Sequence, residues 1–101
     1  IGNMDFEEIW SRLRVHQGED FFTVKNFCFR YQFEPQGLRP ICRNRKTGEL
    51  HPTNRVIPKN YVRIVWEMGP LNCPADILRR DRRITGHNYL FSLFKDERIT
   101  E

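Results

Sequence analysis

The clearest strand signal in this chain is the stretch Phe27-Cys28-Phe29-Arg30-Tyr31-Gln32-Phe33. Its aromatic residues occupy every second position, and a period of two is the period of a β-strand. Aromatic residues are also enriched in strands, because they fit a pleated and half-buried surface. We therefore predict a strand over 27–33 that carries all of its rings on one face.

The aromatic face of this strand has two interpretations. In the first, the rings form the core side of a sheet, because the chain has few other large residues and a large exposed apolar patch would be costly. In the second, the rings form a platform on which unpaired nucleic-acid bases stack, as in single-strand binders. The core interpretation is favoured, and the platform stays open.

The residues before this strand predict a helix and a further strand. Apolar residues recur at helical spacing from Phe6 to Leu13, so we expect an amphipathic helix over 5–16 with Asp5 as its cap. The run over 21–24 is aromatic and β-branched, which is typical of a strand.

The residues after the aromatic strand predict a turn over 34–37 and a third strand over 38–42. Pro40 has no backbone N–H, so we expect this strand to lie at an edge of the sheet or to pair irregularly. The region 43–54 is charged and poor in apolar residues, which predicts a long exposed loop. A short returning strand is expected at 56–57.

The last third of the chain predicts three helices, over 58–68, 75–82 and 85–94. Pro58 suits a first helical position, and Thr85 is expected to cap the last helix. A helix, then strands, then helices is the order of an α+β domain rather than of alternating βαβ units. The predicted fold is therefore α+β, with an N-terminal helix, a small antiparallel sheet of about three strands and C-terminal helices.

A chain of 101 residues fits one domain. Ile1-Gly2-Asn3 precedes the first methionine, so we interpret residues 1–3 as an expression scar and expect the domain to span 4–101. No stretch approaches the roughly 20 apolar residues of a membrane span, and we expect no membrane partner. The 3 cysteines are odd in number and widely spaced, which indicates reduced thiols and a cytoplasmic protein.

The formal net charge of +4 is unevenly distributed. Residues 36–66 hold 7 basic residues and 1 acidic residue, a balance of +6, and residues 79–83 hold 4 and 1, a balance of +3. Residues 1–20 hold 2 basic and 5 acidic residues, a balance of −3. The candidate phosphate-binding residues are Arg43, Arg45, Lys46, Arg55, Lys59, Arg63, Arg79, Arg80, Arg82 and Arg83.

A basic loop beside a basic helix end is typical of a phosphate-binding surface, and arginine suits bidentate phosphate contacts. The leading hypothesis is a small non-enzymatic nucleic-acid-binding module, for DNA more than RNA, with another polyanion as the broader class of partner. The helices over 58–68 and 75–82 would suit a helix-turn-helix, although the arginines come late in the second helix, whereas base contacts come from its N-terminal residues.

The rival hypothesis is a protein–protein interaction module or a small homodimer, in which the acidic first helix faces the basic region of another copy. An enzyme is the third hypothesis, and we assign no catalytic residue. The chain lacks the glycine-rich nucleotide-binding motifs and the paired Cys or His spacing of zinc sites, so no cofactor and no metal is expected.

Overall fold

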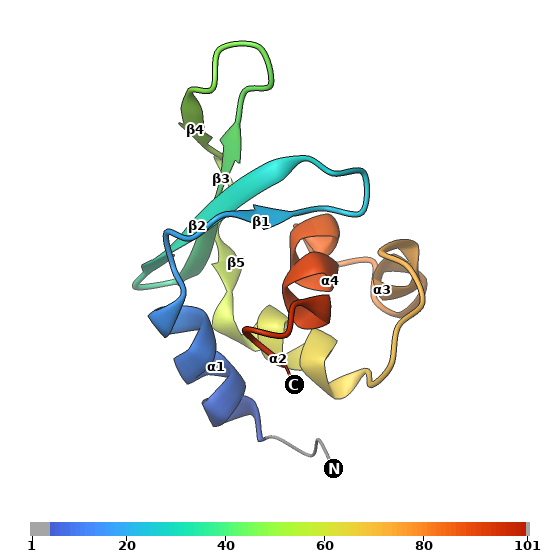
Figure 1. The fold of residues 1–101 in the computed structure, drawn as a ribbon. Helices are drawn as coiled ribbons and strands as arrows, with labels where there is room; N and C mark the ends of the chain where they lie inside the picture. The colour runs from blue at the N-terminus through green and yellow to red at the C-terminus, as the bar shows by residue number, and fades with distance from the viewer. Residues whose placement is uncertain (1–4, 101) are drawn as a thin grey trace.

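The computed structural model describes residues 5–100. The expected expression scar, Met4 and the last residue lie outside the described residues. Within the described range the predicted α+β class is confirmed (Figure 1). The elements in chain order are α1 (Phe6–Val15), β1 (Phe21–Phe22), β2 (Cys28–Glu34), β3 (Gly37–Arg43), β4 (Leu50–Pro52), β5 (Ile57–Pro58), α2 (Lys59–Glu67), α3 (Ala75–Arg80) and α4 (His87–Lys95).

The sheet is antiparallel and has five strands rather than about three. β1, β2 and β3 follow one another, and β4 and β5 share the far edge of β3. The expectation of a loop over 43–54 was therefore wrong in part, since residue 43 ends β3 and residues 50–52 form β4. All three residues of β4 are exposed, so the strand buries nothing that would mark it in the sequence.

Pro40 lies in a central strand rather than at an edge, and the second alternative, an irregular pairing, fits the interrupted edge beside it. In an antiparallel strand the N–H and C=O of one residue point to the same side. The Pro40 carbonyl accepts a hydrogen bond of 3.0 Å from the Thr53 amide, so the missing N–H also faces the β4–β5 edge. β4 ends at residue 52 and β5 begins at residue 57, so Pro40 lies beside the gap between these two strands. The N–H that proline lacks is therefore not needed as a hydrogen-bond donor to a neighbouring strand.

The core interpretation of the aromatic strand is confirmed for its central rings. Phe29 and Tyr31 are fully buried, and Phe33 packs against the core while half-buried. Phe27 departs from the pattern, because β2 begins one residue later and the Phe27 side chain remains 42% exposed. The alternation with a period of two is therefore confirmed, but only part of the aromatic face that it defines is buried in the core.

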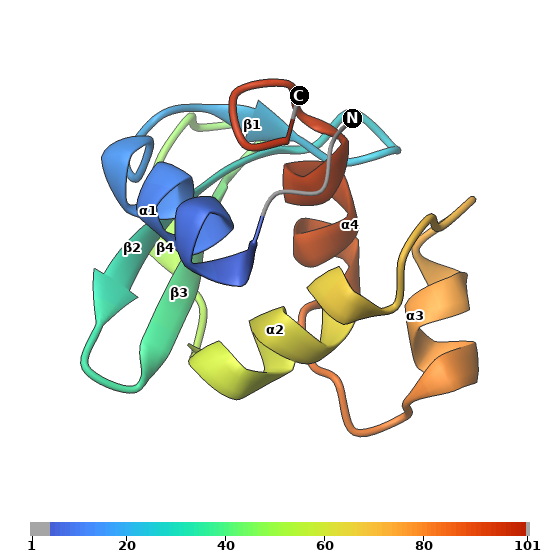
Figure 2. The ribbon, with the colours of Figure 1, turned by 90° about the horizontal axis from the view of Figure 1, so that it is seen from below.

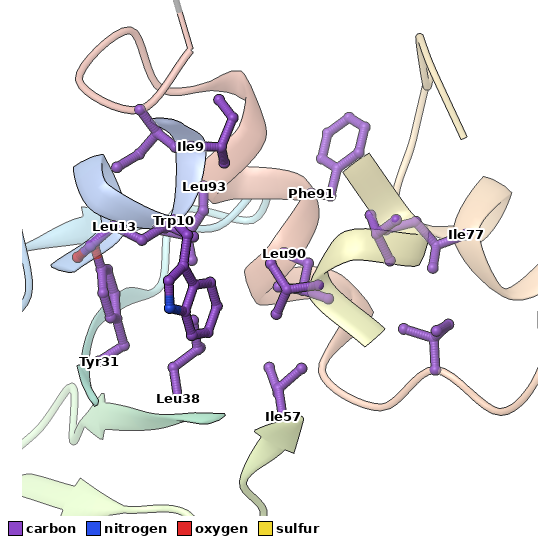
Figure 3. Packing of buried hydrophobic residues seen from close by; sticks show 14 of the residues in the cluster. Ile9, Trp10, Leu13, Tyr31, Leu38, Ile57, Ile77, Leu90, Phe91 and Leu93 are labelled. Carbon is purple, nitrogen blue, oxygen red and sulfur yellow. The ribbon is translucent and has the colours of Figure 1, made fainter. Parts of the chain in front are cut away.

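The helices gather on one side of the sheet (Figures 1 and 2). α1 turns the face that begins at Phe6 and ends at Leu13 toward the core, as its spacing predicted. Figure 3 shows buried side chains of α1, β2, β3, β5 and α4 meeting in one cluster. None of the helices within residues 5–100 has the length and apolar character to cross a bilayer.

Two expected helix starts differ from the structure. Pro58 ends β5 and caps α2 rather than opening it, because its φ and ψ of −61° and 149° are extended. Thr85 does not cap α4. The capping position is held by Gly86, whose φ of 70° lies in the left-handed region that glycine enters readily.

Candidate nucleic-acid interface

The ten predicted basic residues occupy separate parts of the fold. Lys59 and Arg63 lie on α2, and four arginines lie at the end of α3 and in the turn after it. Arg55 is exposed in the segment before β5. The remaining three belong to the β3–β4 hairpin, which projects from the end of the molecule opposite α2 (Figure 1).

The cations of α2 form ion pairs with a carboxylate of α1. Lys59 Nζ lies 3.5 Å and an Arg63 Nη atom 3.2 Å from the carboxylate of Glu7. The same two cations lie over the rings of Trp10 and Phe6. Much of the positive charge of α2 is therefore used to join two helices, which makes it a poor source of phosphate contacts.

The arginines around the end of α3 are also held within the chain. Arg79 pairs with Asp76, and Arg83 lies 2.7 Å from the carboxylate of Asp81. Arg80 donates a hydrogen bond of 2.6 Å to the backbone carbonyl of Met68. Arg82 is exposed and has no side-chain partner among residues 5–100, so it is the freest cation of this group.

The helix-turn-helix arrangement gains no support from α3. In such a unit the first residues of the second helix read the bases. Here Pro74 and Ala75, where α3 begins, line a pocket together with residues of the β1–β2 turn. α3 also packs against α4 (Figure 2). Its N-terminal end therefore faces another part of the same chain.

The hairpin tip, residues 44–49, is a preorganised turn. The side-chain oxygen of Asn44 accepts hydrogen bonds from the amides of Lys46 and Thr47, at 2.8 and 3.1 Å. The Thr47 hydroxyl accepts one from the Glu49 amide at 3.2 Å. These contacts fix the backbone conformation of the tip, so its side chains extend from a defined backbone.

Arg43 and Arg45 have different roles, although the sequence grouped them in one loop. Arg43 ends β3, where it lies 3.5 Å from the Asp20 carboxylate and donates a hydrogen bond to the Gly48 carbonyl. Arg45 has no carboxylate partner among residues 5–100. Its guanidinium lies 4.3 Å from the centroid of the Phe27 ring, an apolar contact that the composition of the loop does not reveal.

Three apolar side chains are exposed near the β1–β2 turn, and the sequence analysis missed two of them as candidates, Phe22 and Val24, while it considered Phe27 as a candidate only as part of a stacking platform. Phe22 precedes the β1–β2 turn (residues 23–27), Val24 and Phe27 belong to it, and the three side chains are 57%, 67% and 42% exposed. Lys25 lies in the same turn and is exposed. The sequence places Phe22 and Phe27 near rings that are buried, but only the structure shows that Phe22 is the exposed residue of β1 and that Phe27 lies just before β2 begins.

A neutral polar cluster lies between the sheet and the start of α4. The Cys42 thiol and the Tyr89 hydroxyl are 2.8 Å apart. Burial, together with this hydrogen bond, raises the pKa of Tyr89 to about 12, so the phenol keeps its proton at neutral pH. Burial lowers the pKa of His87, which favours its neutral imidazole. The cluster offers hydrogen bonds without charge.

The described residues do not assemble a metal centre. No group of three or more His, Cys, Asp or Glu side chains within residues 5–100 is arranged to hold an ion. The cysteines at positions 28, 42 and 73 are half-buried free thiols. The side chains described above are cations, exposed aromatic rings and neutral polar groups.

No family model matches this chain, and neither the curated proteins nor the solved structures contain a match to it.

Proposed function

We propose that this chain is a non-enzymatic nucleic-acid-binding module whose contact surface is built from the β3–β4 hairpin tip and the adjacent β1–β2 turn. The observation that carries the proposal is the Arg45 guanidinium over the exposed Phe27 ring, with Lys46 beside it in the hairpin tip. Proteins that bind single strands commonly combine exposed aromatic rings with neighbouring cations. The broader class of partner is a polyanion.

The hairpin is favoured over the other basic residues because of its electrostatics. The cations of α2 and most of those near α3 already pair with carboxylates or a carbonyl of the chain. Arg45 and Lys46 pair with no carboxylate within residues 5–100. Phosphate contact at the hairpin tip therefore breaks no internal ion pair, whereas contact through α2 competes with Glu7.

A labelled duplex and a labelled single strand of the same sequence, titrated at two salt concentrations, test the proposal. Each cation that contacts a phosphate adds roughly 0.7 to the slope of log K against log salt on a single strand. The double variant Arg45→Ala/Lys46→Ala is expected to reduce that slope by about 1.4.

The matched control is Arg79→Ala/Arg83→Ala, which removes the same charge from residues that are paired with Asp76 and Asp81. We expect this control to bind nearly as wild type does. If the two double variants lose oligonucleotide affinity equally, the hairpin tip is not the contact surface. Failure of the wild-type protein to bind either oligonucleotide at low salt would refute nucleic-acid binding altogether.

A protein-interaction module remains the second candidate, because the apolar side chains of Phe22, Val24 and Phe27 lie exposed around one turn. The specific homodimer in which the acidic α1 faces basic residues of another copy is less favoured. Glu7 pairs with Lys59 and Arg63, and Glu8 pairs with Arg12, all within the chain. Sedimentation at several protein concentrations tests for a dimer directly.

A further inference from the structure

A pocket of about 560 Å³ lies between the β1–β2 turn, the ends of β2 and β3, and the first residues of α3 and α4. In Figure 1 the β1–β2 turn extends beyond the sheet on the side of α3 and α4, and residues of these three segments line the pocket. A volume of this size is within the range of small-ligand sites in proteins. The pocket therefore has room for a compact flat group.

The walls of the pocket are mostly apolar. Val24, Phe27 and Phe29 contribute from the sheet side, and Pro74 contributes from the helix side. The Phe29 ring meets the Tyr89 ring edge to face, with centroids 4.9 Å apart, which fixes the orientation of both. Such walls favour a ligand with a large apolar or aromatic face.

The polar groups of the pocket are neutral or positive. The Tyr89 hydroxyl and the side chains of His87 and Asn88 supply hydrogen-bonding groups, and Lys25 supplies a cation. The residues that line the pocket, all of them within the described range, include no Asp and no Glu. Arg45 does not line the pocket, but its guanidinium lies over the ring of Phe27, which does, so a second cation is adjacent to one wall. The charge complement of this site is an anionic ligand.

We propose that this pocket receives one unpaired base of a single-stranded nucleic acid, while Lys25 and Arg45 hold the adjoining phosphates. A nucleotide unites the two properties that the pocket selects, since it carries a flat aromatic base with polar edges and an anionic phosphate. The inference rests on the proposed function and narrows it in two ways. It assigns the base contact to this pocket, and it identifies the ligand as a single strand.

The test separates base recognition from phosphate recognition. Wild-type protein is titrated with a fluorescein-labelled short single strand, and with a strand of equal length that is abasic at every internal position. We expect the base-bearing strand to bind roughly 10-fold more tightly, because aromatic groups in the pocket can stack only on a base.

Two valine variants test whether the preference for the base-bearing strand arises at the pocket. Val24 lines the pocket and Val15 lies on α1 outside it, and the two side chains are 67% and 72% exposed, so Val24→Glu and Val15→Glu should both fold. Each adds one negative charge and weakens binding of both strands. Only Val24→Glu is expected to bring the ratio between the two strands close to one, since only it places a carboxylate at the pocket.

The outcomes distinguish this inference from the proposed function. If wild-type protein binds both strands equally, nucleic-acid binding stands and the base pocket is refuted. An unchanged ratio in Val24→Glu also refutes the pocket, because base recognition then occurs elsewhere. Binding of neither strand overturns both proposals together, and is the result expected if the pocket instead accepts an apolar side chain of a protein partner.

Discussion

The hydroxyl of Tyr31 donates a hydrogen bond of 2.5 Å to the backbone carbonyl of Leu13. Tyr31 is in the middle of β2, and Leu13 is in the last turn of α1, where the carbonyls lack partners inside the helix. Both residues are fully buried. This contact therefore satisfies two polar groups at once and fixes α1 against the sheet.

The variant Tyr31→Phe should lower the free energy of unfolding by about 1–3 kcal/mol, because it leaves a buried carbonyl without a donor. Urea denaturation measures the change. Tyr61→Phe is the control, since the Tyr61 hydroxyl has no hydrogen bond to another of residues 5–100, and its effect should be small. Equal stabilities of Tyr31→Phe and wild type would mean that water or another donor replaces the lost hydroxyl.

The close approach of β5 to β3 depends on Gly37. A Cβ at this position would lie 1.9 Å from the Ile57 backbone oxygen, so Gly37→Ala must separate the two strands. We expect a loss of more than about 3 kcal/mol, in the range of strongly disruptive substitutions. Gly48→Ala meets no atom within 4 Å and only has to adopt a positive φ of 75°. Its cost should be about 1–2 kcal/mol, and thermal or urea unfolding compares the two.

The aromatic residues Phe27 and Phe29 should separate binding from stability. Phe29 is 1% exposed, and Phe29→Ala is expected to destabilise the fold by about 3–5 kcal/mol. Phe27 is 42% exposed, so Phe27→Ala should unfold close to wild type while weakening binding of a single strand. A Phe27→Ala protein that binds normally would exclude this ring from the interface.

The ion pair of Glu34 with Arg39 should make stability depend on pH in the acidic range. Arg39 donates hydrogen bonds of 2.6 and 2.9 Å to the Glu34 carboxylate, and these contacts lower the pKa of Glu34 to about 2. The unfolded chain then binds the proton more readily than the folded chain does. The stabilisation is fully present above pH 4.5 and is lost as the pH falls through about 2.

The variant Glu34→Gln removes this titration. The difference in unfolding free energy between wild type and Glu34→Gln should shrink as the pH falls through that window, as measured by urea denaturation at a series of pH values. Parallel stability curves for the two proteins would show that the ion pair does not persist in solution.

The two arginines of the hairpin should respond differently to replacement. Arg43→Ala removes contacts with Asp20 and Gly48 and is expected to lower the melting temperature. Arg45→Ala/Lys46→Ala removes exposed cations and should leave the melting temperature nearly unchanged. The assignment of separate roles fails if the double variant melts well below wild type, since the hairpin tip would then be part of the stabilising framework.

The sequence predicted those elements whose signal is local. The helix over Phe6–Val15 and the strand over Cys28–Glu34 were found because apolar residues repeat there with the period of one secondary structure. The left-handed start of α4 and the short β4 were not found. Gly86 replaced the expected Thr85 as cap, and β4 is exposed throughout and has no periodic pattern to detect.

Periodicity and composition are read along the chain, and they were enough to predict the α+β class, the central buried rings and the basic character of residues 36–66. The packing of the folded chain was needed to show that Phe27 remains exposed and that a central strand accommodates Pro40. It was also needed to show that Arg45 lies on an aromatic ring while Arg43 lies beside a carboxylate. The partners in these contacts are distant in sequence. Their pairing depends on how sheet and helices pack, and local periodicity does not encode it.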